Sequence, residues 1–292
     1  MSVANDIAVP VGTGLGMSPA RARLARHLAI FGMIVVLWEA ASRLGLIDPL
    51  FLPAPSAIIA AFVSLYVTVG NAWYHLGITL VEVFAGFFAG SALGIGLAIL
   101  VGLNATVRRF MKPYIIVLEA TPRIAVGPII IAALGFGWTS KIAIVMLVCF
   151  FAPFVNTLSG MLSVNEDARE MFRSLGASKW QVFRKLMLPD AMPMIMAGLR
   201  LAMASALSGA LVAEFISANE GMGVLLKRYT STLNMDATFA CLFTLTALGF
   251  LIFRSMERLD ERLVFWRSDA RAVAVGKRRA NAFRSAAIAR GA

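Results

Sequence analysis

Long apolar segments separated by short polar connections make up most of the 292-residue chain. A helix that crosses a bilayer needs about 20 mainly apolar residues, so this pattern predicts an all-α membrane protein. The six expected spanning segments are residues 28–46, 74–103, 113–136, 141–163, 191–217 and 236–257. A further apolar segment, 50–69, contains Pro53 and Pro55 and is thinned by Ser64 and Thr68, so we expect it to lie along the outer membrane surface.

The composition agrees with a membrane protein. Hydrophobic residues make up 59% of the chain and charged residues 15%, whereas ordinary globular proteins have about 45–50% and 25%. Two cysteines and two histidines are too few for a disulfide scaffold or for a metal centre built from these residues. In a membrane protein the net charge of +11 indicates which side the connecting segments face, rather than binding to nucleic acid.

The positions of the basic residues decide between six and seven spans, because one more span reverses the side of every later connection. With six spans and the N-terminus inside, only Lys141, Lys227 and Arg228 lie outside. The segments then facing the cytoplasm are 21–26, 108–112, 169–185 and 254–290. Seven spans would move most of these charges outside, against the positive-inside rule. The rule therefore favours six spans.

This topology divides the chain into three parts. Residues 1–27 are expected to be a disordered cytoplasmic N-terminus, because they are largely polar and precede an apolar segment too long for a cleaved signal. Residues 28–257 form the expected transmembrane domain. Residues 258–292 form a basic cytoplasmic tail close to anionic lipid, so both termini lie in the cytoplasm of an inner-membrane, multi-pass protein.

The connection 164–190 carries explicit signals for two short helices. Asn165 can cap a first helix that ends at Gly176, where glycine supplies a left-handed residue. Ser178 and Gln181 fit a capping box that starts a second helix. Pro189 is expected to end this second helix, because the residue before a proline avoids the helical conformation. The connection is therefore predicted to form a stiff elbow.

This connection is more apolar than a solvent-facing segment needs to be. Its large apolar side chains are Met171, Phe172, Leu175, Trp180 and Phe183. One interpretation is that the connection lies on the membrane with these side chains among the lipid headgroups. The other is that they form a ridge that docks onto a cytoplasmic partner.

The order of residues in this connection resembles a known signature. Glu170-Met171-Phe172, three residues, Gly176, nine residues, Leu186, one residue and Leu188-Pro189 is similar to the permease signature of ATP-binding-cassette (ABC) importers. The flanking motifs resemble the nitrate/sulfonate/taurine branch of these permeases; they include Ser174-Leu175-Gly176-Ala177-Ser178, Gly198-Leu199-Arg200, Leu118 to Ala125 with Pro128, and Ala213-Glu214. The chain departs from the signature where Met171 and Phe172 replace two alanines.

The resemblance implies a type I ABC importer permease fold with coupling helices between spans four and five. It implies a homodimer that works with two ATPase subunits and a periplasmic solute-binding protein. The residues that the resemblance places against the ATPase are Glu170, Met171, Phe172, Leu175, Gly176, Ala177, Ser178, Leu188 and Pro189. The favoured solute is a small anion such as a sulfonate, taurine or nitrate.

The chain has no G-x-x-x-x-G-K-[ST] loop and no catalytic grouping of Ser, His and Asp, so it is not expected to be an enzyme. We expect no cofactor on this chain, and expect ATP and Mg to bind the partner ATPase. Two other classes stay open. An ion-driven secondary transporter would need no ATPase and usually has an inverted repeat. A membrane scaffold would need no pathway.

Candidate pathway residues are the charged groups and prolines within the predicted spans. They are Glu119, Pro122, Arg123, Pro128, Arg200 and Glu214. A charge retained inside a membrane usually faces a partner or water. Arg123 either meets a solute anion or pairs with Glu119 or Glu82, and Arg200 either lines the path or extends its charge to the membrane surface.

Small residues recur every four positions in the second span. They are Gly86, Gly90, Gly94, Ala98 and Gly102. Such a stripe lets two helices approach closely. It either packs this helix within the bundle or forms the contact between two copies of the chain.

Overall fold

The computed structural model describes residues 19–217 and 219–266. All the regular secondary structure in this part of the chain is helical, which confirms the predicted all-α class. Five helical stretches are long and apolar enough to cross a membrane. They are Ala25–Arg43, Asn71–Leu103, Trp138–Leu162, Lys179–Ile216 and Met235–Leu263. These stretches correspond to five of the six predicted spans.

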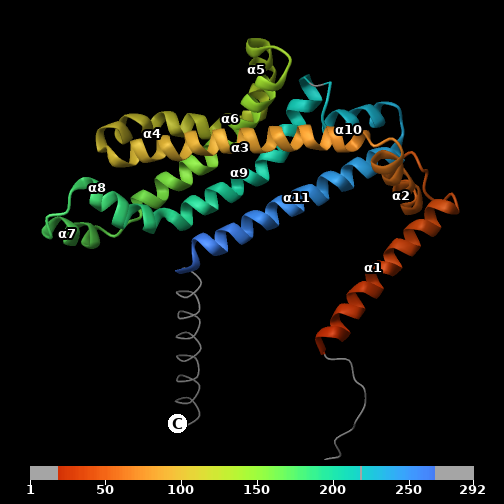
Figure 1. The fold of residues 1–292 in the computed structure, drawn as a ribbon, viewed down its shortest axis with the longest axis horizontal. Helices are drawn as coiled ribbons and strands as arrows, with labels where there is room; N and C mark the ends of the chain where they lie inside the picture. Colours follow the sequence, from red (N-terminus) through yellow and green to blue (C-terminus); the bar gives the residue numbers. More distant parts are fainter. Residues whose placement is uncertain (1–18, 218, 267–292) are drawn as a thin grey trace, which may run out of the picture.

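The helices follow one another with short connections (Figure 1). The α-helices are α1 (Pro19–Arg43), α2 (Pro55–Val63), α3 (Asn71–Leu103), α4 (Ala105–Ala120), α5 (Gly127–Leu134), α6 (Trp138–Leu162), α7 (Glu166–Ser174), α8 (Lys179–Val182), α9 (Leu188–Ser217), α10 (Met222–Ser231) and α11 (Met235–Leu263). Two π-helical turns, Ser64–Thr68 and Phe183–Met187, and one 3₁₀ turn, Arg123–Val126, join neighbouring α-helices.

The predicted third span, 113–136, is not one continuous helix. It consists of the second half of α4, the 3₁₀ turn and α5, with an extended backbone at Thr121 and Pro122. Pro122 has no N–H to continue the helix and pushes Thr121 out of the helical region. Gly135, at a φ of +79°, ends α5. The proline that the sequence marked as an interruption therefore divides this segment completely.

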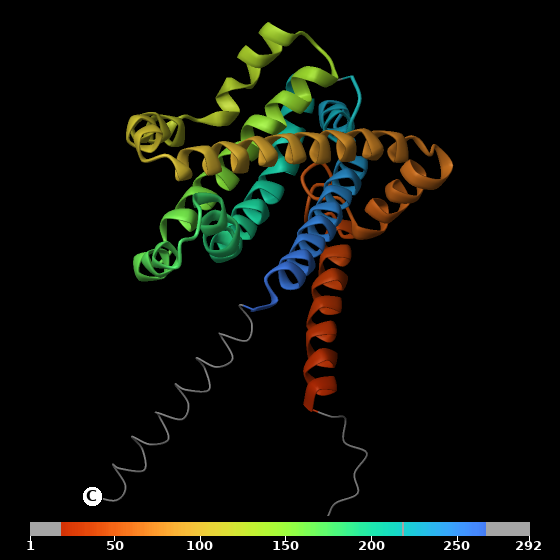
Figure 2. The same cartoon turned by 60° about the vertical axis from the view of Figure 1, so that its left-hand side comes forward.

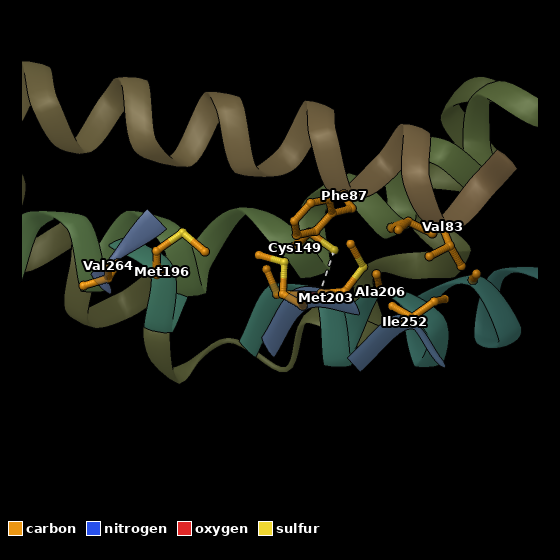
Figure 3. Close-up of a cluster of buried hydrophobic side chains, with 12 residues drawn as sticks. Val83, Phe87, Cys149, Met196, Met203, Ala206, Ile252 and Val264 are labelled. Carbon is orange, nitrogen blue, oxygen red and sulfur yellow. Dashed lines mark hydrogen bonds between the residues drawn. The ribbon is translucent and has the colours of Figure 1, made fainter. Parts of the chain in front are cut away.

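Helices α3, α6 and α9 form the centre of the bundle, and α11 packs along it (Figure 1, Figure 2). Their shared core includes Phe87 of α3, Cys149 of α6, Met203 of α9 and Ile252 of α11, all of which are buried (Figure 3). Burial of these apolar groups holds the helices together through close packing.

The small-residue stripe of α3 lies against α6. A Cβ atom added at Gly90 would collide with the carbonyl oxygen of Met146, and one added at Gly94 would collide with that of Phe150. A Cβ atom added at Gly86 would collide with the side chain of Val145. The stripe therefore brings two backbones together within one bundle, which is the first of the two interpretations.

Helix α1 points away from the bundle in both views (Figure 1, Figure 2). Of the 18 residues in its most apolar stretch, 6% are buried. Its end is held by Glu39, whose carboxylate accepts hydrogen bonds from the backbone N–H and the hydroxyl of Ser56, at 3.0 and 2.7 Å. Glu39 also pairs with Arg43. These contacts fix the angle at which α1 leaves α2.

The two ends of the chain are more helical than predicted. Helix α1 begins at Pro19, so residues 19–27 are helical rather than disordered, and α11 continues into the expected tail as far as Leu263. Residues 1–18 and 267–292 lie outside the described part of the chain.

Candidate functional site

The connection 164–190 forms the predicted elbow in its first half. The side chain of Asn165 accepts a 2.8 Å hydrogen bond from the N–H of Asp167 and so caps α7. At the other end of α7, Gly176 has a φ of +72°. The N–H groups of Gly176 and Ala177 donate to the carbonyl oxygens of Arg173 and Phe172, at 2.9 and 3.0 Å. This pattern closes the helix end as expected for a left-handed glycine.

The second helix of the connection begins where predicted but continues beyond its predicted end. Ser178 and Gln181 form the capping box, with hydrogen bonds in both directions. The prediction that Pro189 ends the second helix is wrong, because the π turn Phe183–Met187 joins α8 to α9. In this turn the N–H of Leu188 donates to the carbonyl of Phe183, five residues earlier. Pro189 then lies in the first turn of α9, where a missing N–H costs little.

Helices α8 and α9 are continuous with each other. Residues Lys179–Ile216 form one helical stretch of 38 residues. The stretch contains Pro189 and Pro193, which donate no backbone hydrogen bond, but it is helical throughout and connects α8 directly to the centre of the bundle.

The side chains of this elbow fall into two groups. Val182, Phe183 and Met187 are buried against the ends of α3 and α6 and anchor the connection to the bundle. Met171, Leu175 and Trp180 are 54%, 77% and 63% exposed. The first group explains why the connection holds its place, and the second is an apolar surface that the described residues leave exposed.

A cavity of about 470 Å³ lies where the predicted third span is divided. Its lining residues are Thr121, Pro122, Arg123, Ile124, Val148, Ala204, Ser205, Ser208 and Gly209. The guanidinium of Arg123 lies 4.4 Å from the centre of the Phe151 ring, a cation–π contact. Among the described side chains Arg123 has no carboxylate partner. The expected alternative of a pair with Glu82 is not observed, and the side chain of Glu119 lies outside the described part of the structure.

The other candidate pathway residues do not gather around Arg123. Arg200 of α9 forms an ion pair with Asp260 of α11, and Pro128 is exposed in the first turn of α5. Glu214 is 1% exposed and points into the bundle. Of the predicted pathway residues whose side chains the structure describes, Pro122 and Arg123 line the same cavity and the others do not.

A network of buried polar groups was not foreseen from the sequence. Lys141 was expected in an outer connection, but it is buried in α6 and forms an ion pair with the buried Glu82 of α3. Nearby, Glu214 of α9 accepts hydrogen bonds from the Thr79 hydroxyl at 2.6 Å and from the Gly223 N–H at 2.5 Å. Glu82 is the residue from which this ion pair could have been predicted. A carboxylate in an apolar segment needs a cation at the same depth in the membrane.

The same network holds the start of α10. The N–H of Gly221 donates to Nδ1 of His75 at 2.9 Å, and the N–H of Met222 donates to the Thr79 hydroxyl at 2.9 Å. Together with Glu214 these groups satisfy the first N–H groups of α10, which have no partner within the helix. The pattern Gly221-Met222-Gly223 thus lets the backbone wrap closely around a buried carboxylate, since a Cβ at either glycine would meet Glu214.

These features define a multi-pass helical membrane protein with a rigid, partly apolar elbow on one end of its bundle. Residues 90–265 match the family described as binding-protein-dependent transport system inner membrane component. The chain belongs to this family, whose members are transport components rather than enzymes. It is the membrane permease subunit of an ABC importer.

Relatives of known name cover most of the chain. It is 34% identical to the formylaminopyrimidine transport permease protein ThiX of Halalkalibacterium halodurans, over 81% of this chain and 94% of ThiX. It is 29% identical to the taurine transport system permease protein TauC of Escherichia coli K12, over 86% of this chain and 93% of TauC.

Solved structures share the fold. A chain of the inward-facing MetNI methionine ABC transporter superposes with a TM-score of 0.55 at 20% identity, covering 68% of this chain and 97% of that chain. A chain of an amino acid ABC transporter crystallised with histidines gives 0.55 at 18% identity, covering 70% and 97%. At these identities the likeness shows the fold alone.

Proposed function

We propose that two copies of this chain form the translocation path for a small anion, that two ATPase subunits bind the connection 164–190, and that a periplasmic binding protein delivers the solute. ATP and Mg bind the ATPase subunits, and this chain needs no cofactor. Membership in a binding-protein-dependent family supports the two kinds of partner.

The observation that carries the ATPase contact is the elbow. It presents Met171 and Leu175 on its exposed face, while Phe183 and Met187 hold it against the bundle. Moving a two-state bundle from about 1:99 to 99:1 needs roughly 5.5 kcal/mol of differential binding. The helical stretch from Lys179 to Ile216, which connects the elbow to the centre of the bundle, supports the transmission of such a force.

The proposed topology has six passages. In it α4 and α5 together form the third passage, although each is too short to cross a bilayer alone. Both termini and the connection 164–190 then lie in the cytoplasm, in agreement with the positions of the basic residues. Residues 28–257 constitute the permease domain in this scheme.

The proposed solute is an anion of the sulfonate, taurine or nitrate kind. Arg123 supports this choice because its guanidinium lines a cavity with the hydroxyl groups of Ser205 and Ser208 and has no carboxylate partner among the described side chains. The relative TauC is named for taurine. The relative ThiX is named for formylaminopyrimidine, so a pyrimidine solute is the second candidate.

Co-purification tests the ATPase contact. The chain is purified in mild detergent from cells that express its own operon, and a bound P-loop ATPase is identified by mass spectrometry. Leu175→Asp should reduce the bound ATPase at least tenfold, because it places a charge on the exposed apolar face of the elbow. Leu46→Asp, at a similarly exposed leucine in the connection after α1, should leave it unchanged.

Equal ATPase binding in both variants would refute the docking role of the elbow. Uptake of the solute by the purified chain alone, driven by an ion gradient, would favour the secondary transporter instead.

Uptake measurements test the anion pathway. In reconstituted vesicles, Arg123→Gln should reduce uptake of taurine or an alkanesulfonate by about tenfold or more, because a hydrogen bond to a charged group contributes about 1.5–3 kcal/mol. Arg228→Gln, at an exposed residue of α10, is the matched control. Unchanged anion uptake in Arg123→Gln would remove Arg123 from the path.

A further inference from the structure

A groove of about 470 Å³ lies between the elbow and the end of α3, apart from the exposed apolar face of α7. Its floor is apolar and includes the buried Val182, Phe183 and Met187. Its rim carries three basic side chains, Arg169, Arg173 and Lys179. A groove with this lining combines a hydrophobic base with a positively charged edge.

The described residues neutralise the positive charge of the rim only in part. Glu166 is the one carboxylate that pairs with the rim among the described residues, at 3.4 Å from Nη1 of Arg169 and 4.0 Å from Nη1 of Arg173. Lys179 has no acidic partner among the described side chains. Nε of Arg169 is buried without a hydrogen-bond partner. The two guanidinium groups thus share a single carboxylate that is 60% exposed, and the ammonium group of Lys179 pairs with none among the described side chains.

A further guanidinium is bonded to a residue that lines the groove. Nη1 of Arg108, at the start of α4, donates to the carbonyl oxygen of Gly102 at 3.4 Å, and Gly102 lines the groove. This corner of the molecule therefore concentrates positive charge from both the elbow and α4. A ligand with at least one negative charge would relieve the repulsion among these groups.

The depth of the groove suggests the kind of ligand. Gly102 and Leu103 are the last residues of α3, which is long enough to span the bilayer, so the proposed topology places the groove near the cytoplasmic lipid headgroups. Trp180, which is 63% exposed, stands at its edge, and tryptophan prefers this level of a membrane. Basic pockets at the ends of spanning helices bind anionic headgroups.

We propose that this groove binds the phosphate headgroup of an anionic phospholipid, with the Arg169, Arg173 and Lys179 side chains around the phosphate and the start of an acyl chain on the apolar floor. A free phosphate ion would leave this floor uncovered. An acidic segment of a partner protein would have to enter at the depth of the lipid, whereas the exposed Met171 and Leu175 do not line the groove. The bound lipid would brace the elbow against α3.

Native mass spectrometry of the detergent-purified protein tests this proposal. The protein is titrated with phosphatidylglycerol and, separately, with phosphatidylcholine of the same chains. Each basic residue near an anionic lipid contributes about 1 kcal/mol, or about fivefold in affinity. The triple variant Arg169→Gln, Arg173→Gln, Lys179→Gln should therefore lose at least tenfold in phosphatidylglycerol affinity, and phosphatidylcholine binding should not change.

The matched control is Arg184→Gln, Lys185→Gln, which removes exposed charges from the same connection but outside the groove. It should keep phosphatidylglycerol binding. Equal losses in both variants, or no preference for phosphatidylglycerol in the wild type, would overturn the proposal. Full displacement of the lipid by millimolar inorganic phosphate would also overturn it, because a free ion would then be sufficient.

The lipid titration needs no ATPase, so its outcome is independent of the proposed function. If the triple variant keeps its lipid but no longer co-purifies with the ATPase, the groove is a protein-docking surface and the lipid proposal is wrong.

Discussion

The hydroxyl of Thr79 on α3 donates a 2.6 Å hydrogen bond to the carboxylate of Glu214 on α9, across 135 positions of sequence. Both side chains are buried. The Thr79 oxygen also accepts the N–H of Met222, and the second oxygen of Glu214 accepts the N–H of Gly223. Two spanning helices and the start of α10 are therefore joined through one pair of side chains.

The first prediction concerns this pair. Thr79→Val keeps the shape of the side chain but leaves the N–H of Met222 and one oxygen of Glu214 without their partner. A buried polar group without a partner costs about 1–3 kcal/mol, so the apparent unfolding temperature in detergent should fall. Thr246→Val removes an exposed hydroxyl that bonds only within α11, and it should have little effect.

A double-mutant cycle adds a sharper test. Glu214→Gln alone should destabilise the protein, and the combination with Thr79→Val should cost less than the two single changes together, since the residues share one network. Additive costs would contradict the direct coupling of Thr79 to Glu214.

The second prediction concerns the buried ion pair of Glu82 and Lys141. Lys141→Met leaves the carboxylate of Glu82 buried without a cation, which costs about 3–5 kcal/mol. Thermal unfolding and the yield of monodisperse protein should both fall. Glu82→Gln combined with Lys141→Met should restore much of the loss, because replacing a whole buried ion pair is often nearly neutral. No rescue by the double change would show that Lys141 acts through another group.

The third prediction concerns the contact between α3 and α6. Gly90→Ala should push these helices apart and cost about 1–3 kcal/mol, because the new Cβ would meet the carbonyl oxygen of Met146. Gly96→Ala, on the same helix, is the control, since a Cβ there meets no atom within 4 Å. The unfolding temperature of the Gly96 variant should match or exceed that of the wild type. Equal stability of the two variants would contradict the close approach at Gly90.

The fourth prediction concerns the elbow. Gly176 has a φ of +72° and open space around it, so Gly176→Val introduces backbone strain without a steric clash. The angle between α7 and α8 should change, and stimulation of the partner ATPase by loaded binding protein should be lost while membrane insertion is kept. Gly176→Asn should retain coupling, because asparagine tolerates the left-handed conformation. Normal transport and normal ATPase stimulation in Gly176→Val would refute the lever role of the elbow.

The elements that could be predicted from the sequence are those whose stabilising hydrogen bonds join residues close together in the chain. The Asn165 cap, the left-handed Gly176 and the Ser178–Gln181 capping box all formed as expected, because each involves partners at most five positions apart. The end of the second helix at Pro189 could not be predicted in the same way. A π turn stabilised by the buried Phe183 and Met187 lets the chain continue through the proline.

The candidate site was predicted only in part for a related reason. Arg123 and Pro122 were identified because a charge and a proline are conspicuous in an apolar segment. Lys141 was assigned to an outer connection, because its position near the end of a span gave no sign that it turns inward to Glu82. Neither His75 nor Gly221 gave a sequence signal of its own, since the two residues that bond to each other are 146 positions apart in the chain.

The sequence by itself determined the class of the protein, most of its spanning helices and the family to which it belongs, because apolar length, helix caps and signature motifs are local properties. Only the tertiary structure decided which charges meet inside the bundle, which face of α3 packs on α6, and how α8 joins α9. These outcomes depend on contacts between helices distant in sequence, where burial makes each polar group require a partner and no local pattern records which partner it finds.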